Sequence, residues 1–236
     1  MPPPAPTFSH GSDGRLTTRD LGRFPGESLF DRIARAVCAA ECLPRKELYE
    51  AWEVARRVRR VCRGGRVLDV GGGHGLLAQI MLLLDDTSPV AVVVDPAPPP
   101  SQPRVREALV AAWPRLDGRV AFAPVGIGEV AATAADLIVS CHACGRLTDA
   151  TLDLAIGARA PVAVLPCCHD HACCETGELA GWMPADLAID ATRAARLRQQ
   201  GYRIWTKTIP VEVTPRYRLL IGQPVEGRPI SPPPPS

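Results

Sequence analysis

The sequence lacks the features that would mark a membrane or secreted protein. No window approaches the ~20 uninterrupted apolar residues that a transmembrane helix needs. The first residues, MPPPAPTFSHGSDGR, have neither the basic start nor the apolar core of a signal peptide. Nine cysteines without a secretion signal favour reduced thiols over a disulfide framework. We therefore expect a cytoplasmic protein that makes no contact with a membrane.

A strong charge of one sign is also missing. The formal net charge is only +2, which does not by itself indicate a nucleic-acid binder. The charge is uneven, however, because the stretch ARRVRRVCRGGR (55–66) holds six arginines and no acid. That stretch is either a solvated helix face or a patch that faces phosphate groups. The basic residues are nearly all arginine, and alanine and proline are abundant, which is typical of a GC-rich bacterial genome.

The order of apolar segments predicts an α/β fold. Two amphipathic helices are expected within 28–62, and from residue 66 onward short apolar runs alternate with helical ones. Such an order implies a doubly wound, mostly parallel seven-stranded sheet with an N-terminal helical extension. The last two strands are too close together for an intervening helix, so they should pair antiparallel. The expected strands are 66–70, 89–95, 119–125, 135–141, 160–166, 202–210 and 215–222.

One domain with extensions at both ends accounts for the whole length. A chain of 236 residues can bury one sizeable core, and no internal repeat is visible. Both ends are rich in proline, which favours disorder. The predicted parts are a disordered or extended segment (1–27), N-terminal helices (28–62), the main domain (63–224) and a disordered tail (225–236).

The segment VLDVGGGHG (67–75) carries the strongest functional signal. A glycine-rich turn follows a strand and opens a helix, which is where doubly wound sheets bind ligands. Asp69 precedes the glycines, and Asp95 ends the next strand, where a carboxylate can accept hydrogen bonds from both hydroxyls of a ribose. The spacing differs from the G-x-G-x-x-G of dinucleotide sites, and no P-loop lysine follows.

This D-x-G-x-G-x-G pattern resembles motif I of the class I S-adenosylmethionine (SAM) methyltransferases, and the resemblance covers roughly residues 60–222. It implies that 63–224 is a SAM-dependent methyltransferase domain. It also implies that Asp69 contacts the methionine amino group, that Asp95 holds the ribose, and that the glycines lie against the methionine and ribose. Residues after the third strand would border the adenine. The implied cofactor-binding residues are Asp69, Gly71, Gly73, Gly75, Asp95, Gly126 and Ile127.

A narrower resemblance lies in SCHACGRLTDATLDLAI (140–156). This segment is similar to the H-x-C-G-x-x-[ST]-D element of a branch that includes the eukaryotic tRNA acceptor-stem 2′-O-methyltransferase and several methyltransferase-like proteins. PCCH (166–169) and TPRYR (214–218) resemble two further elements of that branch. The resemblance implies methyl transfer to a hydroxyl or nitrogen acceptor. RNA is slightly favoured over a protein or a small molecule as that acceptor.

The cysteine- and histidine-rich segments SCHAC (140–144) and LPCCHDHACC (165–174) should meet at one edge of the sheet, because they end adjacent strands. Histidine titrates near neutral pH and can position or deprotonate an acceptor. The candidates for the acceptor side are His142, Cys144, Cys168 and His169.

Two other interpretations of these residues stay open. The thiols and imidazoles are soft ligands that suit zinc or another soft metal, and a protein that binds metal or senses redox state on a SAM-type fold is the non-enzymatic alternative. The thiols could instead be small packing residues, as expected for Cys38, Cys42 and Cys62. The possible metal ligands are Cys141, Cys144, Cys167, Cys168, His169, His171, Cys173 and Cys174, and no subset of them is assigned.

Overall fold

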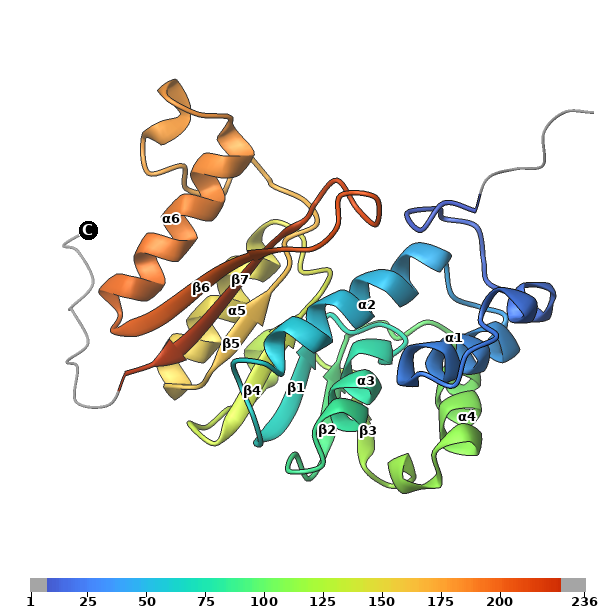
Figure 1. Ribbon diagram of the computed structural model, residues 1–236. Coiled ribbons are helices and arrows are strands. Elements are labelled where there is room, and N and C mark those ends of the chain that lie inside the picture. The colour runs from blue at the N-terminus through green and yellow to red at the C-terminus, as the bar shows by residue number, and fades with distance from the viewer. Residues whose placement is uncertain (1–7, 226–236) are drawn as a thin grey trace, which may run out of the picture.

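The computed structural model describes residues 8–225 and contains one seven-stranded sheet with helices on both faces (Figure 1). The strand order is β3-β2-β1-β4-β5-β7-β6. The first five strands are parallel, and β7 is antiparallel to β5 and β6. This confirms the predicted fold class and the antiparallel hairpin. The strands are β1 (Arg66–Val70), β2 (Ala91–Val94), β3 (Val120–Ala123), β4 (Asp136–Ser140), β5 (Val162–Val164), β6 (Tyr202–Thr208) and β7 (Arg218–Pro224).

The helices form two layers. One face carries α2 (Arg45–Val58), α3 (Leu76–Leu84) and α4 (Gln102–Ala112), with α1 (Leu29–Ala40) packed on α4. The other face carries α5 (Arg146–Ala158) and α6 (Ala185–Gln199). None of the helices between residues 8 and 225 is long and apolar enough to cross a bilayer.

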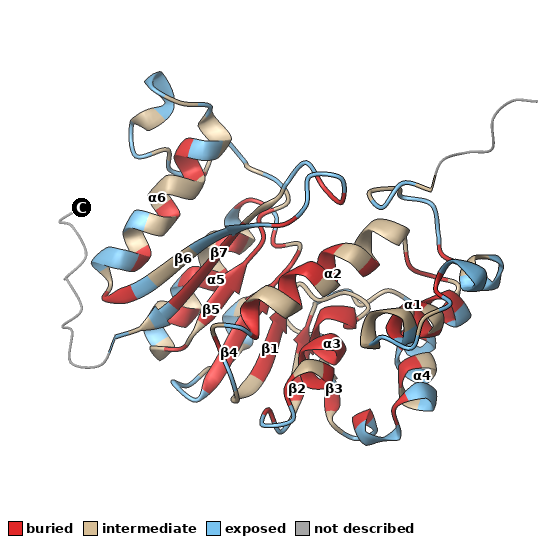
Figure 2. Ribbon diagram, viewed as in Figure 1, coloured by how far each residue is buried: buried red, intermediate tan, exposed pale blue. Residues whose placement is uncertain are grey.

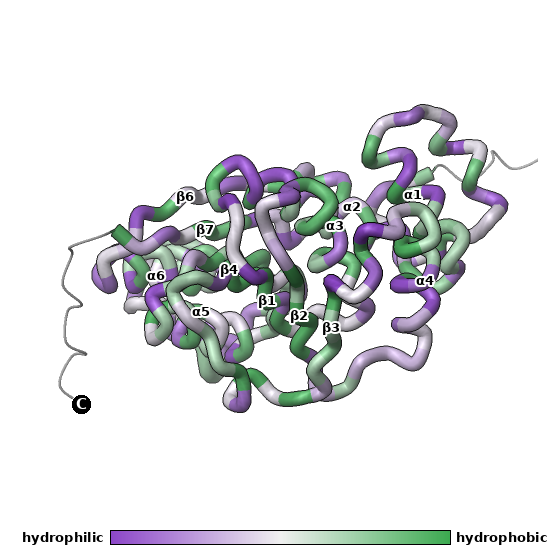
Figure 3. Tube along the Cα trace, turned by 90° about the horizontal axis from the view of Figure 1, so that it is seen from below, coloured by the Kyte–Doolittle hydropathy of each residue, from purple (hydrophilic) through white to green (hydrophobic). Residues whose placement is uncertain are grey.

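The core follows from strand alternation in β1. Successive side chains point to opposite faces, so Val67 packs with α2 and α3 while Leu68 packs with α5. The central strands are accordingly buried on both faces (Figure 2), and hydrophobic residues run along them (Figure 3). Helix α3 is apolar apart from Gln79, because it lies between the sheet and α2.

Residues 8–27 pack against the helical layer. Leu16 and Phe24 are buried, and the Leu16 amide donates to the Leu43 carbonyl at 3.0 Å. This part of the segment predicted as disordered or extended (1–27) is therefore held by contacts that are distant in sequence. Residues 1–7, and residues 226–236 of the predicted tail, lie outside the described residues.

The arginines of 55–66 mostly form bonds within the chain. Arg59 is buried, donates to Ser88 Oγ at 2.7 Å, and lies 3.1 Å from Asp85 Oδ2. Arg66 forms a bidentate pair with Asp136 at 2.8 and 2.9 Å. Arg56 and Arg57 pair with Glu53, whereas Arg60 and Arg63 are exposed. The stretch is thus neither a fully solvated face nor a continuous free cationic patch.

Candidate functional site

A pocket lies at the carboxyl ends of β1 and β4, where α2 meets the glycine turn. The loops after these strands meet there because the strands are neighbours in parallel register. It is a small, partly open hollow with a cavity volume of about 30 Å³. The structure brings the predicted residues Asp69, Gly71 and His142 together in this pocket. The full lining is Glu47, Ala51, Asp69, Gly71, Gly72, His74, Leu76, Leu77, Cys141 and His142.

The glycine turn approaches its neighbours too closely for a side chain. A Cβ at Gly72 would lie 2.7 Å from the Asp69 carboxylate carbon and 2.7 Å from Val93 Cγ1. Gly75 has a φ of +71° and begins α3 from the left-handed region, which glycine adopts at little cost. Glycine at these positions keeps the carboxylate in place and leaves the backbone open to a ligand.

Asp69 is a buried acid with one unsatisfied oxygen. Its Oδ2 accepts a hydrogen bond from the Ala78 amide at 3.1 Å, whereas Oδ1 has no hydrogen-bond partner among residues 8–225. Burial raises the pKa of this carboxyl to about 7, and the nearby charge of Asp95 adds to the effect. A buried polar atom without a partner is costly. The site therefore suits a ligand that brings a donor, and a cationic amino group is the best match.

Asp95 lies beside the turn, one residue past β2. Its Oδ2 accepts from the Gly73 amide at 3.0 Å, and its Oδ1 accepts from the Ala97 amide at 2.9 Å. These two bonds fix the carboxylate while each oxygen keeps a further lone pair for a ligand hydroxyl. Asp95 is half-buried, so it borders the open side of the turn.

Two carboxylates that sequence reasoning missed approach the pocket from α2. Glu50 Oε2 lies 3.4 Å from His142 Nε2, and Glu47 Oε2 lies 3.8 Å from His74 Nδ1. Burial raises the pKa of Glu47 to about 7, and Glu50 acts in the same direction. Partial burial lowers the pKa of His142 to about 4, so its ring is neutral at neutral pH.

The only signal in the sequence for these acids was their i, i+3 spacing in RKELYE, which puts both on one face of α2. That spacing does not show which face packs against the sheet. Glu50 is 2% exposed, a position that the sequence alone would assign to an apolar side chain.

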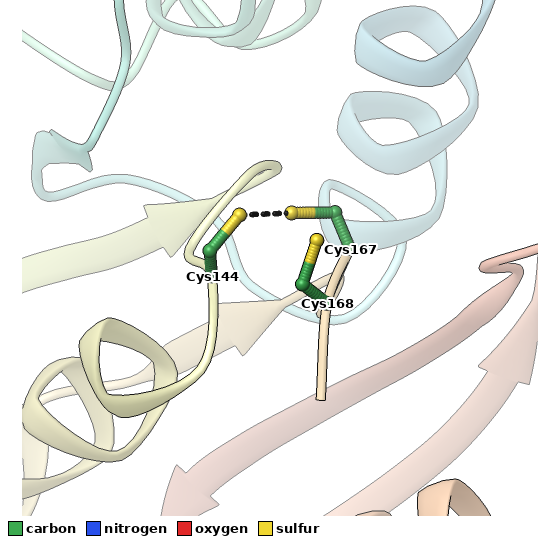
Figure 4. A group of neighbouring side chains, drawn as sticks. All are labelled: Cys144, Cys167 and Cys168. Atoms are coloured by element: carbon green, nitrogen blue, oxygen red, sulfur yellow. Dashed lines mark hydrogen bonds between the residues drawn. The ribbon is translucent and has the colours of Figure 1, made fainter. Parts of the chain in front are cut away.

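Three cysteines meet beside this pocket. The sulfur atoms of Cys144, Cys167 and Cys168 all lie within 4.8 Å of one another, and their side chains point toward one another (Figure 4). Cys144 follows β4, and the other two follow β5. The predicted meeting of SCHAC and PCCH is therefore present, and it includes the acceptor-side candidates Cys144 and Cys168. Cys141 is buried and lines the pocket itself.

The remaining candidates of the cysteine-rich segment lie in a separate charged network against α6. His169 Nε2 lies 2.8 Å from Asp190 Oδ1, and His171 Nε2 lies 2.6 Å from Asp186 Oδ1. Cys174 Sγ is 3.5 Å from an Arg193 nitrogen. His169 is thus held by helix carboxylates and does not line the pocket with His142. No local pattern pointed to these acids, because α6 begins 16 residues after His169.

The two residues proposed for the adenine also lie apart from the pocket lining. The Gly126 amide donates to Glu129 Oε1 at 3.0 Å, and Ile127 packs with the core cluster on the α5 face. Gly73 and Gly75 belong to the same turn as Gly71 but do not line the pocket.

Comparison with known proteins identifies the family. A family model described as "Methyltransferase domain" matches residues 46–174, which is more than half of the chain. The chain therefore belongs to this methyltransferase-domain family. The match includes α2, the glycine turn and the cysteine-rich segment. No curated protein matches the sequence.

Solved structures share the fold. An O-methyltransferase family protein from Burkholderia thailandensis has a TM-score of 0.52 at 19% identity, over 90% of this chain and 64% of that one. The SAM-dependent methyltransferase SibL has a TM-score of 0.51 at 18% identity, over 90% of this chain and 67% of SibL. The Bacillus subtilis M1A22 tRNA methyltransferase TrmK has a TM-score of 0.50 at 14% identity, over 75% of this chain and 65% of TrmK. At such identities the likeness concerns the fold alone, and the chain spans about two thirds of the length of these proteins.

Proposed function

We propose that the protein is a SAM-dependent methyltransferase that acts on a hydroxyl or nitrogen acceptor. The observation that carries this proposal is the glycine turn with Asp69 and Asp95, in a chain of the methyltransferase-domain family. The unpaired oxygen of Asp69 fits the cationic amino group of the methionine moiety. Asp95, held by two backbone amides, fits the ribose hydroxyls.

The residues that would hold SAM extend beyond the lining of this pocket. Asp69, inside it, would bind the methionine end, and Asp95, beside the glycine turn, would bind the ribose. Gly126 and Ile127 stay candidates for the adenine end, although they do not line the pocket.

In this proposal the chain supplies binding, orientation and proton removal. When bound, SAM would supply a sulfonium-bound methyl group for in-line displacement by an acceptor nucleophile, with S-adenosylhomocysteine as the leaving group. His142 is the residue best placed to orient the acceptor or take its proton, because its ring lines the pocket and faces Glu50. Glu50 would position that ring. Cys144 and Cys168 lie outside the pocket lining, on the loops that follow β4 and β5, whereas His169 would act only through the α6 network.

RNA is the acceptor class that the resemblance to the 2′-O-methyltransferase branch favours. Phosphate contact would fall to Arg60 and Arg63, the exposed members of the arginine stretch. Protein and small-molecule acceptors are the competing outcomes of the test.

The test incubates the protein with methyl-labelled SAM and a bacterial lysate, and counts label in RNA, protein and small molecules. We expect label in one fraction, lost in His142→Ala but kept in His10→Ala, a matched change at an exposed histidine outside both the pocket lining and the α6 network. Both variants should still bind SAM by calorimetry. Label released by nuclease would support RNA, and label in another fraction would reject RNA.

Two results would contradict the wider proposal. Absence of SAM binding by the wild-type protein would reject the cofactor. Full activity of His142→Ala would remove His142 from the acceptor site.

A further inference from the structure

We propose that Cys144, Cys167 and Cys168 form a site for one Zn²⁺ ion, in which the three thiolates supply three ligands and the fourth position stays open. Cys144 lies two residues after His142, which lines the pocket described above, but none of the three cysteines lines that pocket. The site goes beyond methyl transfer. A bound ion would cross-link the loops that follow β4 and β5.

The distances between the sulfur atoms suit a single ion. Zinc–thiolate bonds of about 2.3 Å in tetrahedral geometry put the sulfur atoms about 3.8 Å from one another. The three Sγ atoms here lie within 4.8 Å of one another, and those of Cys144 and Cys167 are 2.7 Å apart. Small side-chain rotations would bring all three to the required separation, since the side chains already converge (Figure 4).

The backbone holds the two loops in this arrangement without the ion. The Gly145 amide donates to the Cys168 carbonyl at 3.1 Å. The ladder between the same two segments continues through the Leu165 amide, which donates to the Ser140 carbonyl at 2.9 Å. Gly145 has a φ of +51°, and a Cβ there would lie 3.1 Å from Asp170 Cβ. The ligands therefore come from a preorganised pair of loops on adjacent strands.

The exposure of these thiols separates them from packing cysteines. Cys38, Cys42 and Cys62 are buried in the core, as small apolar residues commonly are. Cys144 and Cys168 are exposed, and Cys167 is half-buried. Packing therefore does not explain the three converging thiols, and an ion can reach them from solvent.

The ligand set favours zinc among the soft metals. Thiolates select Zn²⁺, copper(I) and iron–sulfur clusters. The common iron–sulfur clusters are held by four cysteines, whereas across residues 8–225 this group contains three, which matches a single ion better than such a cluster. Three protein ligands with one open position is the pattern of accessible zinc sites. Copper(I) is the competitor that the experiment must separate.

The experiment titrates reduced, metal-free, full-length protein anaerobically with Co²⁺ as a spectroscopic probe. Zn²⁺ and copper(I) are then titrated separately, each against a chromophoric chelator. We expect one Co²⁺ per chain with a sulfur-to-cobalt charge-transfer band, displaced by one Zn²⁺. Cys144→Ser, Cys167→Ser and Cys168→Ser should each lower that band by about one third and weaken Zn²⁺ binding at least about tenfold. Circular dichroism checks that each variant is folded.

Cys173→Ser is the matched control, because that half-buried thiol lies with Arg146 and Asp170 outside the group. It should leave the band and the affinity unchanged. Any of three results would overturn the site: no stoichiometric metal, binding lost in Cys173→Ser but kept in Cys144→Ser, or tight binding of copper(I) without Zn²⁺. The titration uses neither SAM nor an acceptor, so its failure is distinct from failure of the methyltransferase proposal.

Discussion

Asp69 is a residue whose chemistry conflicts with its surroundings, since it is a carboxyl at the buried end of an apolar strand. Its raised pKa of about 7 means that the carboxyl is mostly protonated at pH 6 and mostly ionised at pH 7.5. A cationic amino group binds the ionised form. We therefore expect the affinity for SAM to rise roughly eightfold between about pH 6 and 7.5, above which the amino group of the ligand begins to lose its proton.

Calorimetry across this range measures the effect. Asp95, Glu47 and His142 also face this region, so the Asp69→Asn variant serves as the control. The asparagine side chain cannot titrate, and the variant should bind SAM weakly with a flat profile. If the SAM affinity of the variant changed with pH as steeply as that of the wild type, the pH dependence would arise from a group other than Asp69.

Residues of the site could be predicted from the sequence where a local motif fixes them. Asp69 and Gly71 lie in a strand–turn–helix segment, and His142 follows the neighbouring strand, so strand order alone brings them together. Glu50 could not be found in this way, because its contact with His142 depends on how α2 packs over the sheet. The prediction that His169 lies with His142 was wrong for a similar reason. The carboxylate that binds His169 comes from α6, and the packing of that helix could not be predicted from a local motif.

At the scale of elements, the end of α2 is anchored by a buried ion pair. Arg59 and Asp85 have side chains that are 3% and 2% exposed, and Asp85 Oδ2 also accepts from the Gly64 amide at 2.8 Å. Removing one partner leaves an uncompensated buried charge. We expect Asp85→Ala to lower the free energy of unfolding by about 3–5 kcal/mol.

Urea unfolding followed by circular dichroism measures this loss. Asp86→Ala is the matched control, because Asp86 is the exposed neighbour and pairs only at the surface with Arg115. Its effect should stay within about 0.5 kcal/mol. Equal losses in the two variants would show that the buried pair does not anchor α2.

The strands could be predicted because buried parallel strands are short apolar runs, but their limits depend on neighbours. The expected strand 160–166 shortens to Val162–Val164, and prolines at 161 and 166 flank it. Proline has no amide hydrogen for a ladder. The packing of residues 8–27 was missed because it rests on contacts such as Leu16 with Leu43, which no local pattern encodes.

At the scale of the whole molecule, SAM should stabilise the fold. A ligand at 100 times its Kd adds about 2.7 kcal/mol to the free energy of unfolding. For a chain of this length, 1 kcal/mol shifts Tm by about 2–4 °C. We therefore expect SAM at that concentration to raise Tm by roughly 5–11 °C, as measured by differential scanning fluorimetry.

The Asp95 variants test whether that shift arises at the proposed site. Asp95→Ala removes the acceptors for ribose and for the Gly73 amide, so affinity should fall about 10- to 100-fold and the shift should drop to half or less at the same SAM concentration. Asp95→Asn keeps one oxygen and should lose less. The Tm of each variant with SAM is compared with its own Tm without SAM. This comparison removes any change in stability that the substitution itself causes in the glycine turn. A full shift in Asp95→Ala would place SAM elsewhere on the sheet edge. A ligand bound across the ends of β1 and β2 would contact Asp95, which follows β2 and binds the turn after β1, and its affinity would depend on that carboxylate.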